Sequence, residues 1–439
     1  MPRLLVANDI EELLVNATAM QRKGLGWWSQ RLLWFMQDSD ILVLPEQPDP
    51  VYLEYVARIT GTRLDTVRIV IPPADRHGTE SVSPERLRDP ALKEAVERAI
   101  DGRAVDAIVP LCPSTGVAAL ARSLRLEHAL PGAAFMSQGG GSLANSKVVF
   151  RQIAAGSRVP IAEGGVASEP WEAEALIAGM FARGYSVMVK RDFDQGCKGN
   201  EVLSPQEGVE PLGARRGHVL SGATAITSYL SENWSWLTNG GRHRVVVERY
   251  HPQSRALFAE FDLSDRGVTL AGHGELFAVP MPDGQNIPVQ HASSHAIGEL
   301  VDAGHRLSEA LRAMGYRGVV SADAILTPDG EILFTEHNGR ITGSTHIYAV
   351  VGARVVGPEA ARHRVFVNRE GWTAPSLQVA IERLDTAGLA YDPAAKTGVI
   401  LTCAYNEMMN YVTFTVVAED LGAARRWEER MWQLSPRAW

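Results

Sequence analysis

Short apolar runs alternate with amphipathic segments over the first third of the chain. The apolar runs are "RLLVAN", "DILVLP", "TVRIVIP" and "VDAIVPL", and the segments between the later runs include "DPVYLEYVARITG" and "PALKEAVERAIDG". Strands that alternate with helices are typical of a parallel sheet covered by helices on both faces. Residues 1 to about 135 are therefore predicted to form a doubly wound α/β region.

Two further changes of pattern divide the rest of the chain. Three glycines in "FMSQGGGSLANSK" end the first pattern, and a helix, "KVVFRQIAAG", follows. Antiparallel signals such as "YSVMVKRDFDQGCKGNEVL" continue to about residue 345, and the last section combines "TGVILTCAY" and "NYVTFTVVAED" with an amphipathic helix, "AARRWEERMWQL". We predict a multidomain α/β and α+β fold, with an N-terminal domain over residues 1–140, a central domain over 141–350 and a C-terminal α+β section over 351–439.

The segment "GVVSADAILTPDGEILFTEHNGR" has the pattern of a β-hairpin. Two runs with alternating apolar residues flank Pro328, Asp329 and Gly330, which favour a turn. A two-residue or four-residue loop gives the pairs Asp323–Glu336, Ser321–Asn338 and Ile325–Phe334. A three-residue loop would instead turn Asp323 to the other face of the hairpin.

In the first of these registers, two carboxylates oppose each other on one face. That arrangement is unfavourable unless a positive charge lies between them, and a hard cation with oxygen ligands satisfies the requirement. Asp323, Glu336 and Asn338 are therefore candidate magnesium ligands. A solvated hairpin face is the alternative, and the residues alone leave both interpretations open.

Two other segments carry candidate binding residues. The strand "GYSVMVK" ends at Lys190, and the polar loop after it contains Gly196 and Gly199; such a loop can fold its amides around phosphate, although glycine loops between strands are common. The strand "RVVVERYHP" ends in Glu248, Arg249, Tyr250 and His251, which by themselves indicate only an exposed strand end.

Composition narrows the classes of partner and the cellular compartment. The chain has 439 residues and a formal net charge of −8, with no acidic tail and no long basic run, so nucleic acid and anionic membranes are not expected partners. The three cysteines are far apart and show no metal-binding spacing, which is typical of a reduced protein. No signal peptide and no membrane-spanning run is evident, so we predict a cytoplasmic protein.

Taken in chain order, these pieces resemble the ATP-grasp superfamily. "NSKVVFRQIAAGSRVP" is similar to its lysine-bearing helix, "VMVKRDFDQGCKGNEV" to its phosphate strand and flexible loop, and "EHNGR" to its E-x-N-x-R strand end. The resemblance implies ATP and Mg²⁺ as cofactors. It implies that Lys147 and Lys190 bind the ATP phosphates, and that Gln195, Gly196, Lys198 and Gly199 belong to a loop that closes over them. Glu248, Arg249 and Tyr250 would form the hinge beside adenine. Asp323, Glu336 and Asn338 would bind magnesium, and Arg340 and Lys190 would be catalytic.

This sequence departs from the superfamily pattern at two positions. His251 stands where the hinge usually has an aliphatic residue, and the acid that usually binds ribose shortly afterwards is missing, the next acid being Glu260. The adenine and ribose contacts are therefore the least defined part of the predicted site.

The layout and the stretch "EHNGRITGSTH" resemble, within the superfamily, the pheganomycin-type peptide ligases. That resemblance implies ATP-dependent joining of an unusual amino acid, as a carboxylic acid donor, to the amino terminus of a peptide in natural-product biosynthesis, through an acyl phosphate. A homodimer is compatible with this layout. Two alternatives stay open: a phosphotransferase of the same fold, and a nucleotide-binding module without turnover.

Overall fold

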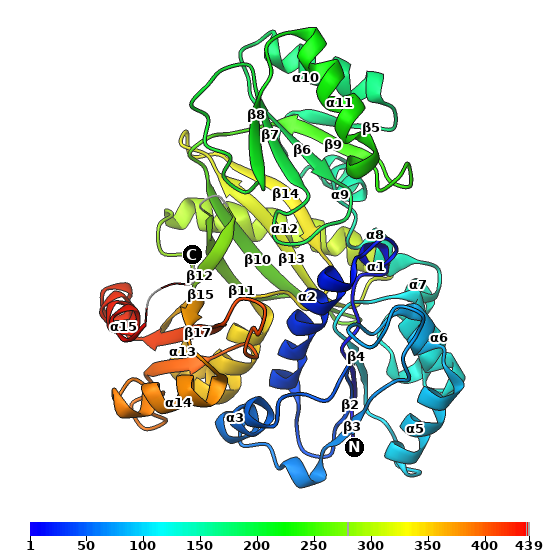
Figure 1. The fold of residues 1–439 in the computed structure, drawn as a ribbon, viewed down its shortest axis with the longest axis vertical. Helices are drawn as coiled ribbons and strands as arrows, with labels where there is room; N and C mark the ends of the chain where they lie inside the picture. Colours follow the sequence, from blue (N-terminus) through cyan, green and yellow to red (C-terminus); the bar gives the residue numbers. More distant parts are fainter. Residues whose placement is uncertain (279–280, 436, 438–439) are drawn as a thin grey trace.

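The computed structural model describes residues 1–278, 281–435 and 437, and their strands form three sheets. Figure 1 shows the five-stranded sheet at the top, the N-terminal region at the lower right and the C-terminal section at the lower left, with the eight-stranded sheet between them. Within these described ranges, no helix has the length and apolar character needed to cross a bilayer.

The N-terminal sheet is parallel, with the strand order β3-β2-β1-β4. Its strands are β1 (Leu4–Val6), β2 (Ile41–Val43), β3 (Arg68–Val70) and β4 (Ile108–Pro110). Leu4 and Val6 share one core with residues of α5 (Pro90–Ile100) and α6 (Thr115–Ser123), whereas Leu5 shares another with α3 (Pro50–Thr60). Alternate residues of one strand therefore face helices on opposite sides, and the prediction of a doubly wound sheet is confirmed.

The central region begins with α9 (Lys147–Gly156), α10 (Pro170–Phe181) and α11 (Ala223–Leu237) around a five-stranded sheet. The sheet has the order β5-β9-β6-β7-β8. Its strands are β5 (Gly164–Ala167), β6 (Val187–Arg191), β7 (Asn200–Ser204), β8 (Arg216–Val219) and β9 (Val245–Arg249). Helices α10 and α11 share an apolar core with β6 and β9, which leaves the carboxyl end of β6 and its loop for the site.

The eight-stranded sheet joins the central and C-terminal regions in the order β14-β13-β10-β11-β12-β15-β17-β16. Its strands are β10 (Arg255–Ser264), β11 (Gly267–Ala278), β12 (Pro282–Ile287), β13 (Gly318–Leu326), β14 (Ile332–Asn338), β15 (Val365–Thr373), β16 (Gly398–Leu401) and β17 (Tyr411–Ala418). Helix α12 (Ser294–Ala313) packs on β10 and β13, and α14 (Leu377–Thr386) and α15 (Leu421–Leu434) pack on the C-terminal strands.

The predicted C-terminal strands and helix are confirmed as β16, β17 and α15. They do not form a sheet of their own, because β15 pairs with β12 of the central region. The domain limits at 140 and 350 stay a prediction, and the second of them falls inside a π-helical segment, η4 (Ile347–Val356).

Close main-chain contacts join the N-terminal sheet to the end of β14. Helix α8 (Gly140–Leu143) passes the end of β4 so closely that a Cβ on Gly141 would lie 2.0 Å from the Pro113 carbonyl oxygen. The Gly339 amide donates to Ala144 O at 2.8 Å, and the Ile341 amide donates to Leu111 O at 3.0 Å. These contacts hold the carboxyl ends of β4 and β14 beside each other.

Candidate functional site

The hairpin β13–β14 has the register that places both carboxylates on one face. Asp323 pairs with Glu336 and Ser321 with Asn338, as predicted, but Ala324 and not Ile325 pairs with Phe334. The reason is a β-bulge after Asp323. The Gly330 amide donates to Thr327 O and the Thr327 amide donates to Glu331 O, so the hairpin has a three-residue loop. That loop alone would have placed Asp323 on the other face of the hairpin. The bulge adds one residue to β14 and so brings Asp323 back to the same face as Glu336.

The side chains of the three predicted magnesium ligands converge. Asn338 Nδ2 lies 2.8 Å from Asp323 Oδ2 and 3.4 Å from Glu336 Oε1, and Ser321 Oγ donates to Asp323 Oδ1 at 2.6 Å. Burial, and after it the charge of Glu336, raises the pKa of Asp323 to about 8. Burial would also raise the pKa of Glu336, but the charge and hydrogen bond of Lys147, together with the charges of Lys190 and Arg340, outweigh it and hold that pKa low. With Glu336 ionised beside Lys147, the neutral form of Asp323 is favoured unless a further cation binds between the two carboxylates.

The two predicted phosphate lysines meet the same short stretch of β14. Lys147, the first residue of α9, contacts Glu336 Oε2 at 2.8 Å and donates to Asp194 O at 3.3 Å. Lys190, near the end of β6, donates at 3.3 Å to the carbonyl of Thr335, the extra residue of the bulge. Burial lowers the pKa of Lys147, but the charge and hydrogen bond of Glu336, with the charge of Asp194, raise it by more. The net effect is a raised pKa, which favours the ammonium form.

Glu248 belongs to a buried ion network. Its two oxygens contact Lys190 Nζ at 2.5 Å and Arg151 Nη1 at 2.7 Å, and the side chains of all three residues are at most 7% exposed. The other two predicted hinge residues also have protein partners: the Arg249 guanidinium lies 3.9 Å from the Tyr185 ring centroid, and the Tyr250 hydroxyl donates to Glu210 O. These three side chains already contact other protein groups, which leaves the main chain of this segment to contact a nucleotide base.

The loop between β6 and β7 folds back toward α9. Asp192 Oδ1 accepts hydrogen bonds from Ser146 Oγ and from the Val148 amide, which ties the start of the loop to the N-terminus of α9. A Cβ on Gly199 would lie 2.6 Å from Asp194 Cβ, so glycine allows the tight return. Gly196 has φ +60°. Gly196 and Lys198 are exposed, whereas Gln195 is half-buried.

Arg340 is buried beside a residue that the sequence did not single out. Its Nη1 donates to Asn145 Oδ1, and Asn145 Nδ2 donates to Gly141 O at 2.9 Å and to Gly339 O at 3.2 Å. Asn145 thus fixes Arg340 relative to α8. Its position two residues before Lys147 in "LANSK" was the available signal, but no motif assigns a role to that position.

Glu260 holds the loop that follows Arg340. The carboxylate is fully buried and accepts hydrogen bonds from the hydroxyls of Thr342, Thr345 and Tyr348. Burial raises the pKa of Glu260. With three hydroxyl donors, this carboxylate holds the loop of residues 342–348 in place.

Arg31 is a second buried residue near Arg340 that sequence reasoning missed. It is 7% exposed, its Nε has no hydrogen-bond partner, and no ion pair to another described residue is formed. The loop after Arg340 passes near Arg31, since an ideal Cβ on Gly343 would lie 4.0 Å from Arg31 Nη1. The Arg31 guanidinium lies 5.1 Å from the centroid of the Trp28 ring. A buried cation without a counter-ion is still costly, which makes Arg31 a candidate for contact with an anionic ligand.

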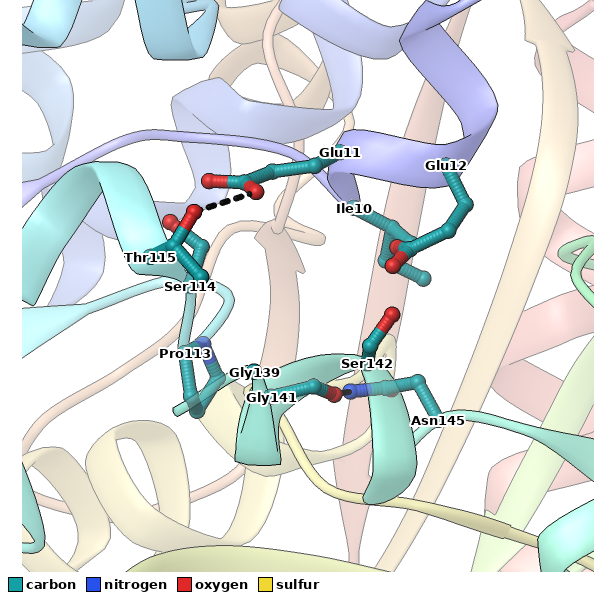
Figure 2. A pocket seen from close by; sticks show the side chains of 10 residues that line it. All are labelled: Ile10, Glu11, Glu12, Pro113, Ser114, Thr115, Gly139, Gly141, Ser142 and Asn145. Atoms are coloured by element: carbon teal, nitrogen blue, oxygen red, sulfur yellow. Dashed lines mark hydrogen bonds between the residues drawn. The ribbon is translucent and has the colours of Figure 1, made fainter. Parts of the chain in front are cut away.

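A pocket of about 70 Å³ lies next to this centre, between the N-terminal sheet and α8 (Figure 2). It is lined by Ile10, Glu11, Glu12, Pro113, Ser114, Thr115, Gly139, Gly141, Ser142 and Asn145. Asn145 therefore lines the pocket and also holds Arg340. The pocket lies outside the carboxyl ends of β1 and β4, where open parallel sheets commonly bind ligands.

The donor set on the hairpin fits a hard divalent cation. Two half-buried carboxylates and one buried amide converge, and Lys147 is the only cation within 4.0 Å of either carboxylate among the described residues. The amide group of Asn338, turned over, would present Oδ1 to a metal ion. No group of three or more His, Cys, Asp or Glu residues with metal-binding geometry occurs in the described part of the chain, so an amide ligand would complete the set.

Sequence comparison finds two family matches. Residues 29–126 match the model described as "Pre ATP-grasp domain", and residues 379–431 match the model described as "PGM1 C-terminal domain". No curated protein matches the sequence. The first segment contains β2, β3 and β4 of the doubly wound sheet but not β1, and the second contains β16, β17 and most of α14 and α15.

Solved structures resemble nearly the whole chain. An ADP complex of PurK, an N5-carboxyaminoimidazole ribonucleotide synthetase, has a TM-score of 0.58 at 12% identity, covering 98% of this chain and 96% of its own. A biotin carboxylase complex from Campylobacter jejuni has a TM-score of 0.60 at 13% identity, covering 99% and 91%. The L-amino acid ligase from Bacillus licheniformis has a TM-score of 0.55 at 12% identity, covering 100% and 98%.

Proposed function

We propose, from the premise that this chain has an ATP-grasp fold with a pre-ATP-grasp domain, that it is an ADP-forming ligase that joins a carboxylate to an amine. The observation that carries the proposal is the pair Asp323 and Glu336, two half-buried carboxylates opposed on one hairpin face with Lys147 and Asn338 in contact. A surface hairpin needs no such arrangement, whereas a metal–nucleotide site does.

The proposed reaction solves a chemical difficulty, because a carboxylate is a poor acyl donor at neutral pH. A carboxylate oxygen attacks the γ-phosphorus of ATP and the bond to the ADP oxygen breaks, which gives an acyl phosphate. The amine then attacks the carbonyl carbon, and the bond to the phosphate oxygen breaks. Phosphate is a good leaving group, so no covalent enzyme intermediate is needed.

The chain's own residues bind and neutralise charge in this scheme. Lys147 and Lys190 hold phosphate oxygens, each exchanging one of its present contacts with Asp194 O or Thr335 O. Arg340, oriented by Asn145, offsets the charge of the transferring phosphoryl group. Mg²⁺ bound by Asp323, Glu336 and Asn338 would supply electrostatic stabilisation of that group.

The finer assignment concerns the substrates. We infer an amino acid-like carboxylic acid as donor and the amino terminus of a peptide as acceptor, in natural-product biosynthesis. The support is the resemblance of "EHNGRITGSTH" and of the three-part layout to pheganomycin-type ligases. The fold likeness to an L-amino acid ligase is compatible with this inference, but at 12% identity it carries the fold alone.

A hydroxylamine assay tests the activity whatever the natural acceptor is, because hydroxylamine captures acyl phosphates. Purified protein is incubated with ATP, Mg²⁺, hydroxylamine and a panel of amino acids and other carboxylic acids, and ADP and hydroxamates are measured. Hydroxamate formed together with ADP for at least one acid is the expected result. ADP with a stable phosphorylated product would favour the phosphotransferase, and nucleotide binding without turnover across the panel would favour a binding module.

A further inference from the structure

The pocket in Figure 2 contains two adjacent acids in different situations. Glu11 is used by the fold: its Oε2 accepts from Thr115 Oγ1 at 2.9 Å and its Oε1 from the Gly116 amide at 2.8 Å, at the N-terminus of α6. Glu12 extends across the pocket toward Ser142. Only one of the two carboxylates is therefore free to meet a ligand.

No other described residue neutralises Glu12. Within the described ranges it forms no ion pair and accepts no hydrogen bond from another residue; only its own main-chain amide acts on it. Burial raises the pKa of Glu12, and the two neighbouring charges, Glu11 on the same helix and Asp192 in the loop after β6, are both negative and raise it further. A half-buried carboxylate in this environment gains most from a cationic hydrogen-bond donor.

The pocket is coupled to the proposed reaction centre through one side chain. Asn145 lines it and accepts a hydrogen bond from Arg340, and Ser142 lines it from the preceding helix, α8. A group bound to Glu12 would therefore lie on the N-terminal-domain side of Arg340. That is a position from which the amine of a substrate can approach the activated carboxylate.

The size of the pocket restricts the group that enters it. About 70 Å³ is half of the roughly 150 Å³ cavity that accommodates a benzene ring. An ammonium group with one or two carbons fits inside, and the rest of a substrate can extend through the open side of the pocket.

We propose that Glu12 binds the protonated amino group of a substrate in this pocket. The ammonium belongs either to the amine acceptor or to the α-amino group of an amino acid donor; the chemistry at Glu12 is the same. The inference rests on the proposed ligase function for the identity of the reactants, whereas recognition of an ammonium group by Glu12 can be measured by binding alone.

The test compares wild type with Glu12→Gln, which keeps the size of the side chain and removes its charge. One arm measures the KM of glycinamide, a mimic of a peptide amino terminus, with the best acid from the hydroxamate panel held saturating. The other arm replaces glycinamide by hydroxylamine, which is largely unprotonated at neutral pH, and measures the KM of the acid. Glu12→Asp, which keeps the carboxylate, should restore part of any loss.

A rise of roughly tenfold or more in the KM of glycinamide, with hydroxylamine-dependent turnover unchanged, assigns the acceptor ammonium to Glu12. A similar rise in the KM of an α-amino acid donor, but not of the matching acid without an amino group, assigns the donor ammonium. Unchanged KM values in both arms overturn the proposal. Glu54→Gln, on the exposed face of α3, is the matched control and should behave as wild type.

Calorimetric titration of glycinamide, and of the α-amino acids of the panel, into the full-length protein with ADP and Mg²⁺ separates this inference from the ligase proposal. If the wild-type protein produces no hydroxamate, the proposed ligase function is contradicted. Weaker binding of any of these amines to Glu12→Gln than to wild type would still support recognition of an ammonium group by Glu12. Equal binding of every one of them to wild type and Glu12→Gln contradicts it.

Discussion

Two carboxylate sites, a buried one about Glu248 and a half-buried one about Asp323, differ in how their negative charge is balanced. Glu248 has a cation on each oxygen, Lys190 and Arg151. Asp323 receives hydrogen bonds from Ser321 and Asn338 but faces a second carboxylate, Glu336. The first site is satisfied by the chain itself, whereas the second is left incomplete, which is the pattern expected where a ligand supplies the missing charge.

The difference teaches where stability and function separate. A satisfied ion network loses stability when one member is removed, because the remaining buried charges lose their partner. A site with two opposed carboxylates lowers the free energy of unfolding until a cation binds, and removing one carboxylate charge relieves the repulsion. The same kind of substitution, carboxylate to amide, should therefore have opposite effects on stability at the two sites.

The largest expected effect is on turnover at the incomplete site. Glu336→Gln removes a charged metal ligand and should reduce ATP turnover on the order of a thousandfold or more, while the protein remains folded. ADP release at saturating Mg²⁺ gives the measurement, with circular dichroism as the check of folding. Glu331→Gln, an exposed position in the same hairpin, is the control and should keep wild-type activity. Near wild-type activity in Glu336→Gln would remove the metal assignment.

The largest expected loss of stability is at the satisfied site. Glu248→Gln leaves Lys190 and Arg151 without their shared carboxylate, and the free energy of unfolding should fall by about 3 kcal/mol or more. Urea denaturation measures it. Glu163→Gln breaks the exposed pair with Arg183 and should change little, since such pairs are well solvated. Equal effects of the two substitutions would mean that the buried network has no special role.

Asp323→Asn should stabilise the protein in the absence of nucleotide and metal. The raised pKa of Asp323 means that burial and Glu336 oppose its charge, and an amide can keep the hydrogen bond from Ser321. We expect a gain of about 1 kcal/mol in the free energy of unfolding at pH 8, together with loss of stabilisation by MgATP. A destabilised Asp323→Asn protein would contradict the contrast between the two sites.

The smallest effect concerns the loop after β6. This loop follows Lys190, which contacts Glu248, and it accepts a hydrogen bond at Asp194 O from Lys147, which contacts Glu336. Gly196 and Lys198 are exposed, so limited proteolysis at Lys198 should be measurable in the free protein. A non-hydrolysable ATP analogue with Mg²⁺ should protect the loop by closing it over the phosphates. Cleavage at the same rate with and without the nucleotide would exclude a closing role.

Much of this contrast could be predicted from the sequence. The opposed pair Asp323 and Glu336 follows from period-two alternation on either side of a turn, and the parallel N-terminal sheet follows from strand–helix alternation. The bulge after Asp323 could not be predicted, because a three-residue loop followed by one extra residue in β14 gives the same Asp323–Glu336 pair as a four-residue loop without a bulge. The correct face was predicted with the wrong loop.

Long-range partners could not be predicted from sequence patterns. Asn145 and Arg340 are far apart in the chain and meet only because α8 packs on the end of β4. Arg31 lies in an apolar stretch, "QRLLWF", where nothing in the sequence indicates a buried guanidinium without a counter-ion. Glu12 is one of two adjacent acids, and only the packing of α6 shows that Glu11 is engaged and Glu12 is free.

The central claim is that a carboxylate is activated as an acyl phosphate at the hairpin face beside Arg340. Incubation with ATP, Mg²⁺, an amine and a carboxylic substrate labelled with ¹⁸O in its carboxyl group tests it most directly. The account predicts ADP as the nucleotide product and one labelled oxygen transferred from each carboxyl group to inorganic phosphate. AMP with pyrophosphate, or ADP with unlabelled phosphate, would contradict it.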